Sequence, residues 1–332
     1  MSANEPPAEF EETGESPEQQ AESLARVERG GIPLAAERRL RELGEQGGAF
    51  TSDLSVADFA LCHRLGLAPV AQVMGSSIYQ VGYQTTPWAS GMGVGGSFMF
   101  EMEALSQAWN EVRNRALSRL AQEATHVGAD AVIGVDLQTG AHDWAENSIE
   151  YVVIGTAVRH AANVNPQDQP SGGGHRHSNA RSRGGNGGSG EPVLTELSVA
   201  DYTKLLGAGV EPLGIVAWSS VFFVAASYET QNMGGLGGRM LYSQNQELRE
   251  FTQGLYEARE IAVGRLTEQA ARLDASGVIG VRIAHGIRQM SVGGGAYARS
   301  GLIVTFHVIG TAIRESEQTP VYAPEMIVDL TT

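Results

Sequence analysis

Cysteine is nearly absent from this sequence. Its 332 residues include one cysteine, Cys62, which excludes an intramolecular disulfide and any cysteine-based metal cluster within one chain. The spacings HxxxH and CxxC, which would indicate a metal site, do not occur either. The sequence therefore favours no metal site within a single chain, although ligands from several subunits of an assembly could still converge.

Basic residues are scarce, and lysine is almost missing. The one lysine is Lys204, and the formal net charge is −15. Because nucleic-acid phosphates are neutralised by clustered Lys and Arg, this balance argues against a nucleic-acid partner. Residues 1–22 hold seven glutamates and no basic residue, which predicts a solvated, disordered tail. That acidic tail is a candidate contact for a protein partner, which the composition does not identify.

Long apolar runs are absent as well. No stretch approaches the roughly 18–20 apolar residues that a membrane-spanning helix needs. The N-terminus lacks the basic-then-apolar pattern of a secretion signal. The sequence thus predicts a soluble, cytoplasmic protein without membrane contact.

What the sequence does contain is a tandem duplication. Residues 54–77 match residues 197–220 at an offset of 143, with ten identities in 24 positions. Residues 111–135 match residues 257–281 at an offset of 146, with eleven identities in 25. The phrase IGTAVR of the first copy returns as IGTAIR in the second. Since the blocks keep their order and only the joins change length, we predict two domains built on one unit.

A linker separates the two copies. It is rich in Gly, Ser, Asn, Pro and Arg and holds almost no apolar residue, so it cannot bury enough surface to offset its ordering entropy. The predicted organisation is a disordered acidic tail with a short helix over residues 1–49, a first domain over 50–160, a flexible linker over 161–192, a second domain over 193–316 and a C-terminal tail over 317–332.

Each copy repeats the same order of predicted elements. The phrase LSVAD opens a short helix, in which Ser55 and Asp58 complement the first backbone N–H groups. Gly66 and Gly209 stand where a glycine commonly follows a helix. A strand rich in Val, Ile, Phe and Tyr comes next, followed by a glycine-rich loop, a long helix and two further strands.

The long helix shows the clearest periodicity. Its apolar residues advance by three or four positions, and each has an apolar mate in the second copy, so one stripe faces a sheet or a neighbour. The fold class is therefore α+β, with two tandem β-α-β-β two-layer sandwiches, each with a short leading helix. The stripe comprises Met102, Leu105, Trp109, Val112, Ala116, Leu120 and Ala124, and its mates are Leu248, Phe251, Leu255, Ala258, Ala262, Leu266 and Ala270.

Three phrases together resemble a known family. They are AREIA at 258–262, GADAVIGVDL at 128–137 and GTAV at 155–158, and they resemble the YbjQ-like family, also named UPF0145 and labelled as a heavy-metal-binding domain. The resemblance covers both copies. It implies a fold related to the dodecin subunit and ring-forming pentamers, with no established activity.

The two copies differ at positions that a metal site could use. Asp130 and Asp136 of the first copy correspond to Ser276 and Arg282 of the second, so a site that needed these carboxylates would exist in the first copy only. The histidines do not recur between the copies either, and the sequence leaves any metal ligand or cofactor unknown. They are His63, His126, His142, His160, His175, His177, His285 and His307.

The glycine-rich loop is the candidate nucleotide site. GMGVGG fits the spacing GxGxxG through Gly91, Gly93 and Gly96, and it lies between a predicted strand and a predicted helix. However, the copy at 234–238 breaks the spacing, and no acidic residue ends a following strand about 20 residues on. The pattern therefore favours a loop that binds no nucleotide.

Two further pairs of residues recur without forming a catalytic set. Ser76-Ser77 returns as Ser219-Ser220, but no histidine recurs nearby to act as a base, which favours polar residues at a strand bend. The pair Glu111 and Arg113 also recurs, as Glu257 and Arg259, and fits the solvated side of a helix or a subunit contact. The sequence thus predicts no catalytic residue.

The resulting hypothesis is a non-enzymatic, oligomerising scaffold or ligand-binding module. The alternatives are heavy-metal or small-ligand binding at subunit interfaces, and an enzyme that uses the glycine-rich loop. Two geometries remain open. Either each domain type closes its own five-fold ring, so that two rings stack, or the two domain types alternate in one ring with an even number of domains.

Overall fold

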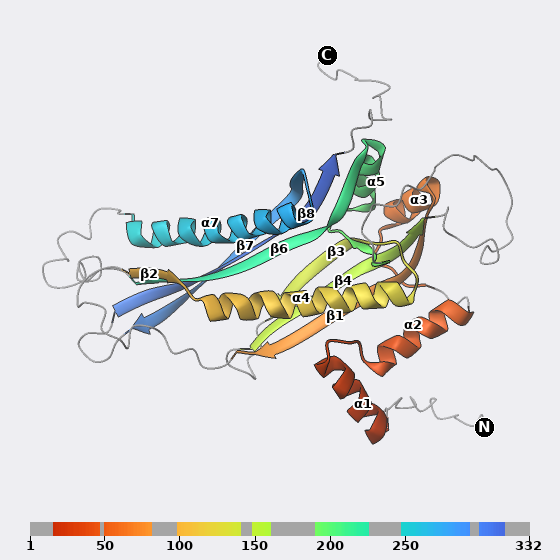
Figure 1. Ribbon diagram of the computed structural model, residues 1–332, viewed down its shortest axis with the longest axis horizontal. Helices are drawn as coiled ribbons and strands as arrows, with labels where there is room; N and C mark the ends of the chain where they lie inside the picture. Colours follow the sequence, from red (N-terminus) through yellow and green to blue (C-terminus); the bar gives the residue numbers. More distant parts are fainter. Residues whose placement is uncertain are drawn as a thin grey trace, which may run out of the picture.

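The computed structural model describes residues 16–46, 50–81, 98–140, 148–160, 190–225, 247–292 and 299–315. We call residues 50–160 unit 1 and residues 190–315 unit 2. Helices and strands alternate through both units, which confirms the predicted α+β class (Figure 1). Before and within unit 1 the elements are α1 (Pro17–Glu28), α2 (Leu34–Gln46), α3 (Val56–Leu65), β1 (Leu67–Gln80), β2 (Phe98–Glu101), α4 (Glu103–His126), β3 (Ala131–Gly140) and β4 (Ser148–His160). Unit 2 contains β5 (Val193–Leu194), α5 (Val199–Gly207), β6 (Val210–Ala225), α7 (Arg249–Arg272), β7 (Gly277–Val292) and β8 (Arg299–Glu315).

The two units exchange strands. One sheet has the order β1-β4-β3-β5, and the other has the order β2-β6-β8-β7. The short strand β5 of unit 2 therefore completes the sheet of unit 1, while β2 of unit 1 completes the sheet of unit 2. The sequence repeat predicts the three long strands of each sheet but not this exchange, because strands of two and four residues carry almost no periodicity.

The predicted helix starts and ends are confirmed. The Ser55 side chain accepts from the Asp58 amide at 3.1 Å, and the Ser198 side chain accepts from the Asp201 amide at 3.2 Å. Gly66 follows α3 with a φ of 69°, in the left-handed region that favours glycine. The repeated phrase LSVAD is therefore a helix N-terminus in both copies.

The long helix α4 packs against both sheets. The C-terminal half of its apolar stripe covers the sheet of unit 1, where Val112, Ala116 and Leu120 are fully buried. Contact with β1 is so close that a Cβ at Gly75 would lie 1.9 Å from the Ala116 carbonyl oxygen. The N-terminal half packs against β6 and β8 of unit 2, through Met102, Leu105 and Trp109. The matching helix α7 packs on the opposite face of the unit 2 sheet.

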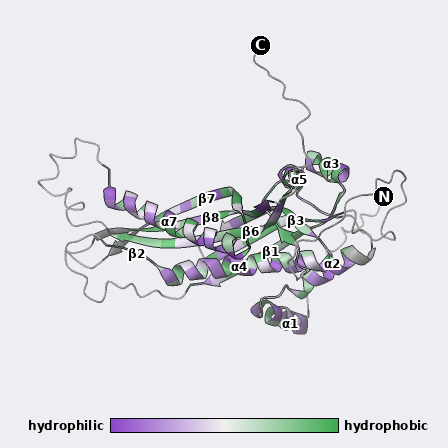
Figure 2. Ribbon diagram, turned by 45° about the horizontal axis from the view of Figure 1, so that its top comes forward, coloured by the Kyte–Doolittle hydropathy of each residue, from purple (hydrophilic) through white to green (hydrophobic). Residues whose placement is uncertain are grey.

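Hydropathy follows these layers. Figure 2 shows purple, hydrophilic residues along α4 and α7 and green, hydrophobic residues along β6. The second face of the unit 1 sheet is covered in part by α3 and α5, which meet there around the buried residues Cys62, Ile133 and Tyr202. Cys62 is fully buried there. Among the described residues, no helix is both long and apolar enough to cross a membrane.

The N-terminal region contains two helices where one was expected. Helix α2 covers the predicted short helix, but α1 spans residues that the sequence assigned to the disordered tail. Its start has a capping box, in which the side chains of Ser16 and Gln19 bond to each other's backbone, and Pro17 occupies the first turn. Both helices lie beside α4, and Leu40 of α2 is 1% exposed within the core of unit 1.

Candidate functional site at the junction of the two units

Backbone pairing forms one half of the junction. Val193 N donates to Asp130 O at 3.1 Å, and Thr195 N donates to Val132 O at 2.9 Å, so unit 2 runs parallel to the edge of β3. Two bonds then return from β3, because Val135 N donates to Thr195 O and Gly134 N donates to Leu197 O, both at 3.0 Å. These parallel backbone bonds fix both the position and the direction of the β5 segment relative to β3.

Strand β2 and helix α4 form the other half. β2 pairs antiparallel with the end of β6, and Met102 N then donates to Val221 O at 2.8 Å. From the first turn of α4, the Ser106 hydroxyl accepts from Val221 N at 2.8 Å. One turn later, Asn110 accepts from Ser219 N at 2.9 Å and donates to Ser219 O at 2.8 Å. Side chains of α4 thus form hydrogen bonds with the edge of β6 beyond the point where β2 ends.

A buried polar cluster lies beneath these contacts. The Ser219 hydroxyl lies 2.8 Å from His307 Nδ1 and 3.3 Å from the Tyr151 hydroxyl, and Tyr151 lies 3.2 Å from the same nitrogen of His307. Arg113 Nη1 donates to the Ser219 hydroxyl at 3.4 Å. The Trp109 ring stands edge-on to His307, with ring centres 4.7 Å apart. Unit 1 therefore supplies Tyr151, Arg113 and Trp109, and unit 2 supplies Ser219 and His307.

Burial determines the charge state of this cluster. It lowers the pKa of His307 to about 4, and the positive charge of Arg113 acts in the same direction. Burial also lowers the pKa of Arg113 to about 10 and raises that of Tyr151. At neutral pH the cluster thus holds a neutral histidine and a charged arginine. Arg113 Nε is buried and has no hydrogen-bond partner among the described residues.

The cluster contains a serine and a histidine at the distance expected of a nucleophile and its base. The sequence repeat missed this pair because His307 has no counterpart in unit 1 and lies 88 residues from Ser219. Yet Ser219 is 1% exposed, and neither of the two cavities beside the junction is lined by Ser219 or His307. The geometry is that of a buried contact that holds the two units together.

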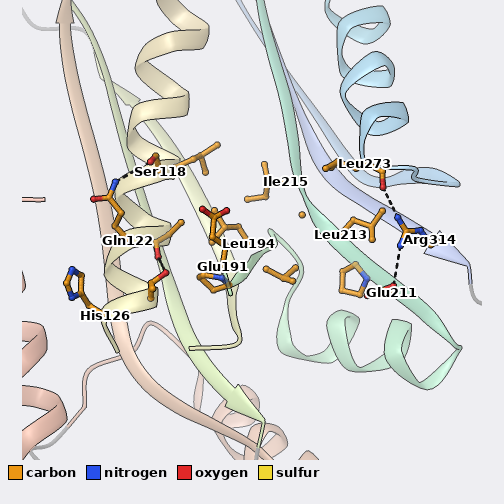
Figure 3. Close-up of a pocket in the computed structure, with 17 residues that line it drawn as sticks. Ser118, Gln122, His126, Glu191, Leu194, Glu211, Leu213, Ile215, Leu273 and Arg314 are labelled. Atoms are coloured by element: carbon orange, nitrogen blue, oxygen red, sulfur yellow. Dashed lines mark hydrogen bonds and ion pairs between the residues drawn. The ribbon is translucent and has the colours of Figure 1, made fainter. Parts of the chain in front are cut away.

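A cleft of about 1230 Å³ opens between the two units, farther along α4 than this cluster (Figure 3). The C-terminal half of α4 forms one wall, the start of β6 forms the other, and the chain leading into β5 lies between them. Apolar side chains, including Leu194, Leu213 and Ile215, line much of it. Arg314 lies at the unit 2 side, donates to Leu273 O at 2.8 Å and approaches Glu211 at 3.8 Å.

A second cavity of about 590 Å³ opens beside the first half of α4. Asn110, Asn114 and Trp218 line it, together with Gly30 from the turn after α1. Residues of both units line this cavity, so both cavities described here lie next to the junction.

The described metal candidates do not gather into a metal site. The described residues contain no group of three or more His, Cys, Asp or Glu side chains that could hold a metal ion. Asp130 approaches His160 Nδ1 at 3.4 Å and accepts from its backbone amide, whereas Asp136 accepts from Gln138 at 3.0 Å. His142, His175 and His177 lie outside the described residues, whereas His63, His126 and His285 lie on α3, α4 and β7.

Of the other predicted positions, the glycine-rich loop lies outside the described residues and the serine pairs lie within them. Gly91, Gly93 and Gly96 lie outside the described residues, so the nucleotide hypothesis stays untested. The serine pairs do not lie at bends, because Ser76-Ser77 and Ser219-Ser220 lie inside the continuous strands β1 and β6. The prediction of a strand bend was therefore wrong; the register shift of β1 occurs earlier, between Pro69 and Ala71.

The recurring Glu and Arg pairs take different positions in the two units. Glu111 is half-exposed and pairs with Arg115 at 2.7 Å, whereas Arg113 is 2% exposed and contacts unit 2. Arg259, the mate of Arg113, is exposed and lies over the Tyr256 ring, 5.2 Å from its centre. The solvated interpretation thus fits Glu111 and Arg259, whereas Arg113 makes a contact between the two units of one chain, and a contact between subunits stays a prediction.

Comparison with known proteins identifies relatives over both units. The family described as "Putative heavy-metal-binding" matches residues 90–161 and again residues 233–315. The encapsulin nanocompartment protein Rv1762c of Mycobacterium tuberculosis is 32% identical over 298 residues, which cover 90% of this chain and 97% of the relative. UPF0145 proteins of Clostridium novyi and Natronomonas pharaonis are 41% and 39% identical over 59 residues, or 18% of this chain and 55% of each relative. No solved structure matches the chain.

Proposed function

Because this chain belongs to the YbjQ-like family and carries two of its domains in tandem, we propose that it is a non-enzymatic subunit of an oligomeric scaffold. The observation that carries the proposal is the two-way strand exchange, in which β2 joins the second sheet and β5 joins the first. An interface between two homologous units can be reused between chains, since the same surfaces occur on every copy.

The polar cluster supports assembly over catalysis. Ser219 is 1% exposed and Arg113 is 2% exposed, so a substrate could reach them only by separating the two units. Buried polar groups whose partners lie on both sides of an interface fix its register, because any shift leaves donors and acceptors unpaired. That property is useful in a building block and of no evident use to an enzyme.

The relative from Mycobacterium tuberculosis is named an encapsulin nanocompartment protein, and we propose that this chain, too, belongs to an assembly of many subunits and lies in the cytoplasm. The pairing of unlike units within one chain supports the arrangement in which unit 1 and unit 2 alternate around one assembly. Such an assembly contains an even number of domains, and five chains would give ten.

Native mass spectrometry of the purified, untagged chain tests this proposal. We expect one multimer with a fixed number of chains, stable on dilution. Glutaraldehyde crosslinking at high protein concentration provides the independent check. Monomers in both experiments would contradict the scaffold function.

A second candidate function is the binding of a small ligand or a metal where the units meet. The cleft of about 1230 Å³ favours it, because ligand sites are concave, largely apolar and frequent at domain interfaces. The same native spectrum would show the ligand as excess mass per chain, and elemental analysis would identify a metal.

The matched variants for this second function are Ala121→Trp, which fills the cleft from its α4 wall, and Ala104→Trp, which lies on the same helix outside it. Bound mass should disappear from the first variant and remain in the second. A multimer that carries no excess mass would remove this candidate and leave the scaffold intact.

A further inference from the structure

We infer that a second copy of this chain docks head to tail on this one, so that unit 2 of one copy contacts unit 1 of the next through surfaces that are equivalent, by the sequence repeat, to those that join the two units within one chain. The inference rests on the proposed scaffold function and specifies its contact surfaces. It follows from the burial of equivalent residues in the two units, which the repeat offsets of 143 and 146 identify.

The first open surface is the outer face of β1 in unit 1. Met74 and Ile78 are 46% and 53% exposed there. Their equivalents in β6 are Ala217 and Val221, which are 4% and 0% exposed. The difference arises because the first turns of α4 lie over β6 at Val221, whereas α1 and α2 leave this face of β1 open. Unit 1 thus presents an apolar face whose copy in unit 2 receives a helix.

The matching helix half is open on unit 2. Tyr256 of α7 is 58% exposed, whereas its equivalent Asn110 is 5% exposed because it bonds to the edge of β6. Leu248, the equivalent of Met102, is 51% exposed. The first two turns of α7 are therefore exposed, whereas the equivalent turns of α4 contact the neighbouring unit.

The second open surface is the edge strand β7. It occupies the position in unit 2 that β3 occupies in unit 1, and β7 ends its sheet whereas β3 is followed by β5. Val281 is 44% exposed on β7, and its equivalent Val135 is 1% exposed on β3. An exposed edge with apolar side chains is a template for pairing with another chain.

The segment that would pair with β7 is present in unit 1. Residues 50–54 are equivalent to residues 193–197, which hold β5 and its bonds to β3. In the described structure residues 50–54 belong to no strand, and Phe50 is 39% exposed. Unit 1 thus carries, outside any described strand, a copy of the segment that β7 lacks.

The open surfaces are complementary in type and lie apart. Figure 1 shows α7 above the strands and β1 below them. Unit 2 of one copy offers a helix end and a strand edge. Unit 1 of the next copy offers an apolar sheet face and an extended segment. Since the two surfaces differ, the contact is heterologous and one copy leaves both of its outer surfaces free for further copies.

Cysteine pairing tests this geometry in the full-length chain. Val132 pairs with Leu194 at the internal junction, so the equivalent positions in the contact between copies are Val278 and Thr51. Thr51→Cys and Val278→Cys are made in separate chains, mixed, and treated with a short bismaleimide. Fully buried Cys62 leaves little background reaction. We expect a covalent dimer with one chain of each kind from the mixture and none from either variant alone.

The positive control is the chain with both Val132→Cys and Leu194→Cys, which should react within one molecule. If that control reacts and the mixture gives no dimer, the inferred contact is wrong. Homodimers from one variant alone would indicate a symmetric interface and also overturn it. Native spectra of the same variants separate this failure from failure of the scaffold function, because they would still show a multimer.

Charged substitutions provide a test that needs no chemistry. Ile78→Glu disables the unit 1 surface and Val281→Glu disables the unit 2 surface, and both positions are exposed, so each monomer should fold. Each variant alone should need a protein concentration about tenfold higher or more than the parent chain to assemble. Their mixture should form a 1:1 dimer and stop there, because one intact pair of surfaces remains.

Leu24→Glu is the control, since Leu24 is 70% exposed on α1 and lies on neither surface. It should assemble like the parent chain. A mixture that stays monomeric, or one that assembles fully, would contradict the head-to-tail contact.

Discussion

Asn110 acts at the edge of β6 as a neighbouring strand would. Its side-chain amide satisfies both the N–H and the C=O of Ser219, and its N–H group also donates to Ser106 O at 2.6 Å. The exposed equivalent on α7 is Tyr256, which cannot offer the same pair of bonds. A single residue thus makes the internal junction chemically distinct from the contact inferred between copies.

Replacement of Asn110 by alanine should destabilise the chain. It leaves the Ser219 N–H and C=O buried and unpaired, which costs about 2–4 kcal/mol of unfolding free energy. Urea unfolding followed by circular dichroism measures the change. The control Gln107→Ala, on an exposed face of the same helix, should stay within about 0.5 kcal/mol of the parent. Equal losses in the two variants would contradict the role given to Asn110.

His307 should make stability depend on pH. Because burial lowers its folded pKa to about 4, below its unfolded value near 6.5, the unfolded chain binds the extra proton first. The contribution of His307 is fully present above pH 6.5 and is lost as the pH falls toward 4, with a slope of up to about 1.4 kcal/mol per pH unit.

Urea midpoints between pH 7 and pH 4 test this in the parent chain and in His307→Phe. The variant should lose less stability across that window, because the phenyl ring takes up no proton. The comparison cancels the titration of carboxylates, which both proteins share. Parallel curves for the two chains would show that His307 is not buried as a neutral ring.

At the scale of whole elements, the N-terminal helices are part of unit 1. Arg119 of α4 donates to Val27 O at 2.8 Å and to Gly31 O at 3.1 Å, so it bonds to the turn region that joins α1 to α2. Arg39 of α2 lies 3.0 Å from the buried Glu123 carboxylate, which also accepts from Met74 N at 2.9 Å. These contacts tie α1 and α2 to α4 and to β1.

Leu40→Ala should therefore cost about 2–5 kcal/mol, as expected when a fully buried leucine is truncated. Leu24→Ala on exposed α1 is the matched change and should cost less than about 0.5 kcal/mol. Guanidinium unfolding gives both values. A small loss of unfolding free energy in Leu40→Ala would show that α2 is not part of the core of unit 1.

The sequence predicts the long elements well because the duplication tests each pattern twice. Both copies of the helix stripe are apolar at every position, and Val112 and Ala258 are both fully buried. Helix α1 was missed because acidic composition outweighed a local signal, the capping box of Ser16 and Gln19. Strands β2 and β5 could not be predicted, since their formation depends on an edge supplied by the other unit.

The junction residues escaped prediction for a related reason. Comparison of the copies selects residues that recur, and a contact between unit 1 and unit 2 occurs once in each chain. His307 corresponds to Val152, and Tyr151 corresponds to Phe306, so neither has a polar mate. Residues that serve the single internal junction are expected to differ between the copies, and only spatial proximity identifies them.

For the molecule as a whole, the exchange of β2 and β5 should hold the units together without a covalent link. We predict that a specific protease site placed between residues 161 and 189, once cleaved, leaves two fragments that elute together at the size of the uncut protein. Size-exclusion chromatography before and after cleavage tests this, with elution in urea as the control that separates them. Fragments that part under native conditions would show that the junction is weaker than its bonding indicates.

The exchanged strands also place a time order on folding. While only unit 1 has left the ribosome, the edge of β3 has no β5, and Leu105 and Trp109 of α4 have no sheet from unit 2 to cover. The first half of the chain must wait, partly unpaired, until the second half is made. During that interval unit 2 of a neighbouring chain offers the same strand and the same sheet, provided that this neighbour has not yet joined its own two units. We therefore expect rapid completion of the second half to favour closure of a chain on itself, and slow completion at high chain density to favour closure on a neighbour.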